Sequence, residues 1–183
     1  MTTRESLLGI VFDFGGVIWN MRWDVCRELE DTHALPRGAI FETLYRTQTW
    51  QAIELGRGDL GAWREEAHRL LEAGAGRPLP GLHDAWRAAQ HLIAENVALV
   101  GALRPPYRIA LLSNADSSLP DRLKNGGIDG LFDAVVCSAK VGMAKPEPAI
   151  YRLASDRLGL LPEECVFVDD HAPNVAAAEE VGM

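Results

Sequence analysis

The 183-residue sequence predicts an α/β fold: a doubly wound, Rossmann-like core with a parallel sheet, and an inserted all-helical cap. Three observations predict it. Four short apolar runs are spread along the chain, helical patterns separate the last three of them, and a long stretch without a clear strand pattern follows the first. Strands that alternate with helices need crossover connections, and such connections place the strands parallel in one sheet.

The first apolar run covers residues 8–14 (LGIVFDF) and ends at Gly15 and Gly16. Nearly every residue in it is apolar, which predicts a strand buried on both faces. Three similar runs cover residues 107–112, 132–137 and 165–168. Helical patterns occupy residues 117–125, 147–158 and 174–181. Glycines follow the first and the third of these helices, and prolines open the second.

Residues 19–94 are predicted to form the helical cap, and residues 1–18 and 95–183 the core domain. In the cap, Asp59 can cap a helix whose apolar residues share one face, and Pro36 can open another helix. No convincing strand is predicted there. Four tryptophans of this insert are expected to serve in packing: Trp23, Trp50, Trp63 and Trp86.

The composition restricts the partners and the compartment. The formal net charge is −8 at pH 7, and an acidic surface repels nucleic acids and anionic lipids. No apolar run approaches the roughly 20 residues that cross a bilayer, and the start of the chain lacks a secretory pattern. Cys26, Cys137 and Cys165 form neither a zinc nor a disulfide pattern, so we expect buried thiols in a cytoplasmic protein.

Polar and charged residues follow the predicted strands at the point where each strand ends. Ligands of open α/β sheets bind beyond the carboxyl ends of the strands, so these side chains are expected to meet in one crevice. They are, in chain order, Asp13, Ser113, Asn114, Lys145, Asp169 and Asp170.

The charges of this group predict a metal. Asp13, Asp169 and Asp170 would repel one another at close range, and Lys145 supplies a single positive charge. A hard divalent cation offsets such an excess, and Mg²⁺ suits carboxylates, a backbone carbonyl and water. The pattern therefore predicts a Mg²⁺ cofactor and a small phosphorylated substrate that completes the coordination shell.

Four motifs, in this order, resemble those of the haloacid dehalogenase (HAD) superfamily, in particular its branch with a helical cap after the first core strand. They are VFDFGGVI at residues 11–18, LLSNADSS at 111–118, VGMAKPEPAIY at 141–151 and VFVDDHAPNVAAAEEVGM at 166–183. The motifs span nearly the whole chain, whereas the cap carries little of the resemblance.

The resemblance implies a role for each residue at a strand end. Asp13 is implied to be the nucleophile that attacks phosphorus and forms an aspartyl-phosphate. Ser113 and the Asn114 amide are implied to hold the phosphoryl oxygens. Lys145 is implied to offset negative charge in the transition state.

The resemblance also implies a set of metal ligands. Asp170 is implied to bind Mg²⁺ directly, together with Asp13 and the backbone carbonyl of Gly15. Asp169 is implied to bind the ion or to orient one of its waters, and Asn174 to support this acidic loop.

Gly15 departs from the family pattern. Most phosphatases of the family carry at this position a second aspartate, which protonates the leaving group and then activates water. Loss of general acid–base help typically costs about 10²–10⁴-fold in rate, so substrates with good leaving groups are expected to suffer least. His171 and Asp24 are candidate substitutes by position alone. The family also usually continues into a further strand, so a core that stops at Met183 is expected to lack an edge strand.

The favoured interpretation is an enzyme that removes phosphate from a small metabolite. One alternative is a 2-haloacid dehalogenase, in which Asp13 attacks carbon without a metal and Arg46 can bind a substrate carboxylate. A metal-free site has no need of Asp169 and Asp170, which argues against this alternative. Another is a catalytically weak protein that binds phosphate or has a regulatory role.

The cap is expected to select the substrate by closing over the crevice. Trp50, Glu54 and Arg57 are candidate contacts in the cap segment TWQAIELGRGDL. The particular metabolite and the oligomeric state stay open at this level.

Overall fold

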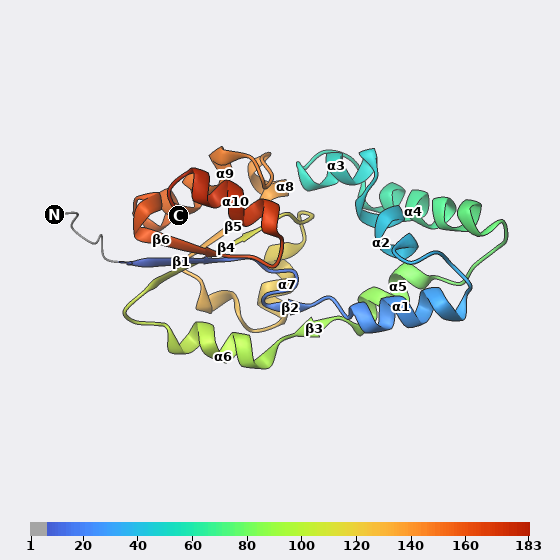
Figure 1. Ribbon diagram of the computed structural model, residues 1–183, viewed down its shortest axis with the longest axis horizontal. Helices are drawn as coiled ribbons and strands as arrows, with labels where there is room; N and C mark the ends of the chain where they lie inside the picture. The colour runs from blue at the N-terminus through green and yellow to red at the C-terminus, as the bar shows by residue number, and fades with distance from the viewer. Residues whose placement is uncertain (1–6) are drawn as a thin grey trace.

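The computed structural model describes residues 7–183 and contains a layered α/β body beside a lobe made of helices (Figure 1). The body is built on a four-stranded sheet in the order β5-β4-β1-β6. Its strands are β1 (Gly9–Phe12), β4 (Arg108–Ser113), β5 (Ala134–Cys137) and β6 (Cys165–Val168). Because β1 pairs in parallel with β4 and β6, and β4 with β5, the predicted parallel sheet is confirmed.

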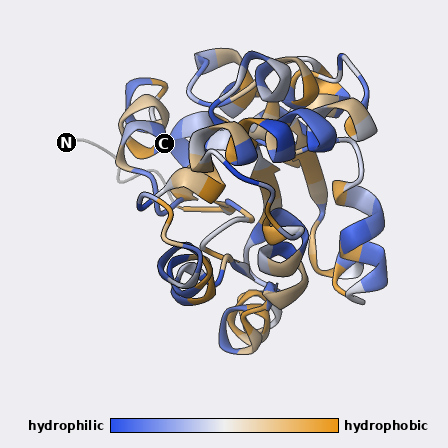
Figure 2. Cartoon of the chain, turned by 90° about the vertical axis from the view of Figure 1, so that its right-hand side faces the viewer, coloured by the Kyte–Doolittle hydropathy of each residue, from blue (hydrophilic) through white to orange (hydrophobic). Residues whose placement is uncertain are grey.

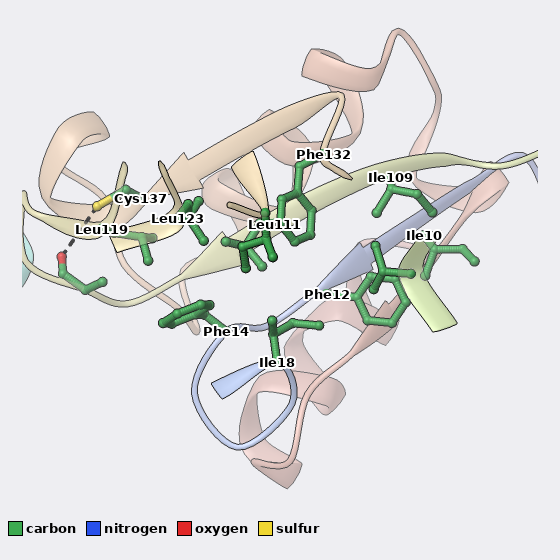
Figure 3. Close-up of a cluster of buried hydrophobic side chains, with 13 residues drawn as sticks. Ile10, Phe12, Phe14, Ile18, Ile109, Leu111, Leu119, Leu123, Phe132 and Cys137 are labelled. Carbon is green, nitrogen blue, oxygen red and sulfur yellow. Dashed lines mark hydrogen bonds between the residues drawn. The ribbon is translucent and has the colours of Figure 1, made fainter. Parts of the chain in front are cut away.

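Helices cover both faces of this sheet. They are α6 (Ala94–Ala102), α7 (Leu119–Asn125), α9 (Pro148–Leu158) and α10 (Ala172–Glu180). Ile10 and Phe12 pack in one hydrophobic cluster with residues of α6 and α7 (Figure 3). Val11, which points to the opposite face, packs in a second cluster with α9 and α10. Both faces of β1 are therefore buried, which explains its almost continuous run of apolar residues.

The hydropathy of the chain follows these layers. Figure 2 shows mainly hydrophobic strands in the interior and hydrophilic residues along the outer sides of several helices. The three predicted core helices are present, with ends that differ by one or two residues from the prediction. Three short elements complete the core: η1 (Asp129–Leu131), α8 (Ser138–Val141) and η2 (Pro162–Glu164). The free thiols of Cys26, Cys137 and Cys165 are buried, as predicted.

The lobe consists of five helices between β1 and α6. They are α1 (Trp23–Thr32), α2 (Ala39–Tyr45), α3 (Gln48–Glu54), α4 (Leu60–Ala75) and α5 (Leu82–Ala89). The Asp59 carboxylate accepts a hydrogen bond of 2.8 Å from the Ala62 amide and so caps α4, as predicted. The helix expected to open at Pro36 starts later, at Ala39.

A short ribbon joins the lobe to the core. β2 (Trp19–Asn20) and β3 (His91–Leu92) pair antiparallel at the two ends of the helical insert. The expectation of no strand in this stretch is therefore wrong. Two-residue strands are too short to show an alternating pattern, and their pairing joins segments far apart in the sequence. The boundaries 1–18, 19–94 and 95–183 stay a prediction.

Three of the four lobe tryptophans are buried. Trp63 and Trp86 are fully buried, and their indole N–H groups donate to the carbonyls of Leu44 and Met21 at 2.7 and 2.6 Å. Trp50 is 8% exposed. Trp23, in contrast, is 40% exposed, so packing does not account for all of its surface.

β6 lies at one edge of the sheet in the described part of the chain, and Val166 and Val168 are exposed there. Among residues 7–183, no helix combines the length and the apolar character needed to cross a bilayer.

Candidate active site

The carboxyl ends of the parallel strands lie together at the edge of the sheet that faces the lobe. Asp13 directly follows β1, Ser113 is the last residue of β4, and Asp169 directly follows β6. This arrangement arises from the strand order, because β1 lies between β4 and β6. The sheet therefore brings residues that are far apart in the sequence into one site.

The ammonium of Lys145 joins two of these carboxylates. Its Nζ atom lies 2.8 Å from Oδ1 of Asp13 and 2.5 Å from Oδ2 of Asp169. Only 2% of the Lys145 side chain is exposed. Such a buried ammonium needs charged partners, so the lysine and the two aspartates form one electrostatic unit.

Asn114 fixes the backbone of this lysine. Its Oδ1 accepts a hydrogen bond of 2.8 Å from the Lys145 amide, and its Nδ2 donates one of 2.9 Å to the Lys145 carbonyl. The resemblance placed the Asn114 amide beside the phosphoryl group. In the structure, the same amide also holds the lysine loop against the end of β4.

Asp169 is held by three donors. Its Oδ2 accepts hydrogen bonds from Lys145 and, at 2.9 Å, from Nδ2 of Asn174. Its Oδ1 accepts one of 2.8 Å from the His171 amide. The side chain is fully buried. These contacts fix the carboxylate in one orientation.

Asp13, Asp169 and Asp170 offer oxygen atoms that all lie within 4.8 Å of one another. Among residues 7–183, Lys145 is the only lysine or arginine within salt-bridge distance of any of them. Burial raises the pKa of Asp13 to about 6; Lys145 opposes this effect, and Asp169 adds to it. Burial and Asp169 also raise the pKa of Asp170.

This cluster therefore carries more negative charge than its lysine balances. Close carboxylate oxygens on a rigid frame are the ligands that hard divalent cations prefer, and Mg²⁺ needs only one or two of them beside substrate and water. The donor set thus fits the predicted metal.

Gly16 allows the loop after β1 to approach Asp170. Its φ is 81°, in the left-handed region that favours glycine. A Cβ atom at this position would lie 2.0 Å from Oδ2 of Asp170. Any side chain here would therefore force the Asp170 carboxylate to move.

A cavity of about 520 Å³ opens between this edge of the sheet and the lobe. Ser113, Asn114, Lys145 and Asp170 line it from the core. Of the predicted cap contacts, Trp50 and Glu54 line the cavity and Arg57 does not; Arg46 also lines it. Four further aromatic side chains, which the sequence did not single out, also line it: Phe14, Trp19, Phe41 and Tyr45.

The two candidate substitutes for the missing acid–base group differ in position. His171 is exposed and lines the cavity. Asp24 is not among the lining residues, and its carboxylate pairs with Arg22 at 2.8 Å. The hydrogen bond from Arg22 lowers the pKa of Asp24 to about 2, so this carboxyl is a poor proton donor near neutral pH.

A family model described as haloacid dehalogenase-like hydrolase matches residues 7–182. The chain belongs to this family. It is 33% identical over 187 residues to a phosphatase of Mycobacterium tuberculosis, an alignment that covers 97% of this chain and 85% of that protein. It is 26% identical over 180 residues to a sesquiterpene phosphatase of Aspergillus oryzae, with 94% and 85% covered.

Solved structures of HAD proteins share the fold. A HAD family enzyme of Bacteroides thetaiotaomicron, in complex with magnesium and inorganic phosphate, matches with a TM-score of 0.73 and 23% identity over 97% of this chain and 92% of that one. An L-2-haloacid dehalogenase of Xanthobacter autotrophicus, with chloropropionic acid covalently bound, matches with a TM-score of 0.66 and 24% identity, covering 97% and 75%. At these identities the likeness shows the fold alone.

The raised pKa of Asp13 predicts a stability effect in this HAD hydrolase. Below its ordinary pKa of 3.8 the carboxyl is protonated in both the folded and unfolded states, and above about 6 it is ionised in both. Between these values the folded state binds more protons, so stability falls as the pH rises. The difference between the two pKa values corresponds to about 3 kcal/mol in the free energy of unfolding. Without metal, Asp13→Asn is expected to unfold at a higher denaturant concentration than the wild type at neutral pH, but not near pH 4.

Asp24→Asn provides a control with the opposite sign. The pKa of Asp24 is lowered, so its stabilising effect is present above pH 3.8 and is lost as the pH falls toward 2. This variant should be slightly less stable than the wild type at neutral pH. Urea denaturation in EDTA, repeated between about pH 2 and pH 8, measures the stability of both variants. A lower stability of Asp13→Asn throughout this range would contradict the charge balance described for the site.

Proposed function

We propose that this HAD hydrolase is a Mg²⁺-dependent phosphatase that releases phosphate from a small phosphorylated metabolite through an aspartyl-phosphate on Asp13. The observation that carries the proposal is the buried contact of Lys145 with Asp13 and Asp169, next to the carboxylate of Asp170. This contact holds the proposed nucleophile, Asp13, in place. The carboxylates beside it suit a cation, and the Lys145 ammonium suits a phosphate.

Asp13, Asp170 and the backbone carbonyl of Gly15 would hold the Mg²⁺ ion. When bound, the ion would offset negative charge on the phosphoryl group. Asp169 is already held by Lys145, Asn174 and the His171 amide, which favours a role in orienting a metal water over a full share in coordination. The Asp169 carboxylate already accepts three hydrogen bonds, so few of its lone pairs are free to bind a cation.

The covalent step belongs to Asp13. A carboxylate oxygen attacks phosphorus, the bond from phosphorus to the leaving oxygen breaks, and the leaving group departs with its electron pair. The Lys145 ammonium stabilises the charge that develops on the phosphoryl oxygens, and the Ser113 hydroxyl donates to one of them. Water then cleaves the aspartyl-phosphate, which frees phosphate and restores Asp13.

Relatives support this reaction over the alternatives. Both curated relatives described above are phosphatases, and the Bacteroides enzyme was solved with magnesium and phosphate. The fold also accommodates dehalogenation, as the Xanthobacter enzyme shows for itself. The acidic pair Asp169 and Asp170 favours the phosphatase, because displacement of halide from carbon needs no cation.

Substitution of the nucleophile tests the proposal. Asp13→Asn is expected to reduce Mg²⁺-dependent hydrolysis of p-nitrophenyl phosphate by at least about 10³-fold, because the amide does not form the covalent intermediate. EDTA should abolish wild-type activity, and added Mg²⁺ should restore it. Asp24→Asn, outside the cavity, serves as the control and should keep wild-type turnover.

Three results would lead to a different conclusion. Turnover that survives Asp13→Asn would exclude this nucleophile. Halide release from 2-chloropropionate without metal would indicate a dehalogenase. A burst of phosphorylated protein without further turnover would indicate a phosphate-binding or regulatory protein.

Gly15 provides a second test. A Cβ atom at this position would have Met21 Sδ as its nearest neighbour, at an ordinary contact distance of 3.6 Å, so the backbone leaves room for a Cβ atom. Gly15→Asp is expected to raise turnover of alkyl phosphates by about tenfold or more, and that of acetyl phosphate much less, because the poorer leaving group needs a proton.

Gly15→Asn is the matched control, since it has nearly the same shape and no proton to transfer. A gain in Gly15→Asn equal to that in Gly15→Asp would show that the effect is not acid–base catalysis. Steady-state rates measured for both variants on both substrates decide this point.

A further inference from the structure

Four aromatic side chains of the lobe form a continuous surface that lines the active-site cavity. This aromatic wall consists of Trp23, Phe41, Tyr45 and Trp50. Neighbouring ring centroids lie 5.4 Å apart from Trp23 to Phe41, 5.4 Å from Phe41 to Tyr45, and 4.8 Å from Tyr45 to Trp50. The rings belong to α1, α2 and α3, so three helices of the lobe contribute to one surface.

Packing accounts for part of this wall, because Trp50 belongs to the buried cluster of the lobe and Phe41 and Tyr45 pack against that cluster. It does not account for Trp23. Trp23 is 40% exposed, whereas the neighbouring Trp86 is fully buried. A large aromatic surface left in contact with water is unfavourable by roughly 25 cal/mol per Å². Exposed apolar surface in a concave site typically marks a place where a ligand binds.

The core adds further apolar surface to the same cavity. Phe14 and Trp19 stack with their ring centroids 5.5 Å apart and pack in the core cluster, whereas Met21, which follows β2, packs against the lobe cluster. All three line the cavity. The space beyond the charged cluster is therefore bounded by apolar groups from both the lobe and the core.

Polar side chains of the lobe also line the cavity: Arg46, Gln51, Glu54 and Gln90. Oε1 of Gln90 accepts a hydrogen bond of 3.1 Å from Trp19, which leaves its buried Nε2 without a partner. The Arg46 guanidinium lies over the Phe41 ring, 5.6 Å from its centroid. Recognition of a sugar requires several converging donors and acceptors. The four rings of the aromatic wall instead offer flat faces, which suit an apolar group.

We propose that the aromatic wall binds the organic part of the substrate, and that this part is an aromatic or extended apolar group. The inference rests on the proposed function and adds the substrate class to it. The cavity volume of about 520 Å³ far exceeds what a phosphate group needs and lies within the range of about 300–1,000 Å³ that is typical of sites for drug-sized ligands. The phosphate binds at Lys145 and Ser113, while the apolar group extends along the wall.

Binding of phosphonates tests this inference without requiring turnover. With Mg²⁺ present, 1-naphthylmethylphosphonate is expected to bind the wild type at least about tenfold more tightly than methylphosphonate or 2,3-dihydroxypropylphosphonate, measured by calorimetry. The three probes share one head group and differ only in the part that meets the wall. A tenfold difference in affinity corresponds to about 1.4 kcal/mol of binding free energy. Burial of a bicyclic ring can contribute more than this.

Substitutions test whether the aromatic wall causes the preference for the naphthyl phosphonate. Trp23→Ala should weaken naphthyl binding about tenfold and leave methylphosphonate binding unchanged, and Trp23→Phe should retain most of the affinity. Leu99→Ala, an exposed apolar residue of α6 outside the cavity, is the control and should change neither. Because Trp23 is partly exposed, its truncation should leave the lobe folded, and circular dichroism checks this.

Equal affinity for the three phosphonates, or tighter binding of the dihydroxypropyl probe, would overturn the inference. So would a loss of methylphosphonate binding in Trp23→Ala as large as the loss of naphthyl binding. Failure of the proposed function has a separate signature, because naphthyl selectivity would then persist while acetyl phosphate and p-nitrophenyl phosphate are not hydrolysed.

Discussion

The ammonium of Lys145 lies buried between the carboxylates of Asp13 and Asp169, and the geometry of the site depends on this contact. A buried charge without a partner is strongly destabilising, so the three side chains must fold together. The strand order provides for this, because the ends of β1 and β6 are neighbours and the Lys145 loop is tied to the end of β4 by Asn114. The sheet thus acts as the frame that fixes a reactive group.

The same contact leaves the site short of positive charge. One lysine faces three carboxylates, and burial makes ionisation of Asp13 less favourable than it is in water. Groups arranged for catalysis often reduce stability in this way. Under the proposed function, a bound cation and a phosphorylated substrate would each offset part of this negative charge. The electrostatics of the site would then link folding, metal binding and substrate binding.

Much of the core could be predicted from the sequence because the relevant signals are local. The apolar runs indicate strands that are buried on both faces, and Asp59 indicates the start of α4. The acidic pair and Lys145 could be placed together because parallel strands end at the same edge of the sheet. Their distances and hydrogen bonds required the structure.

Other features depend on contacts between distant segments and could not be predicted. The ribbon of β2 and β3 pairs residues that are separated by the whole insert, and each strand has only two residues. Phe41 and Tyr45 appear in the sequence as ordinary apolar positions of a helix. Only the packing of α1, α2 and α3 turns their rings toward the site as one surface.

Calorimetric titration of Mg²⁺ into the wild type and Asp170→Asn at neutral pH tests most directly whether these carboxylates form a cation site. Asp170 makes no salt bridge with a lysine or arginine in the described part of the chain, so its substitution should disturb the fold little. The wild type is expected to bind one Mg²⁺ ion and the variant to lose that binding. Absence of binding in the wild type, or equal affinity in the variant, would contradict the account.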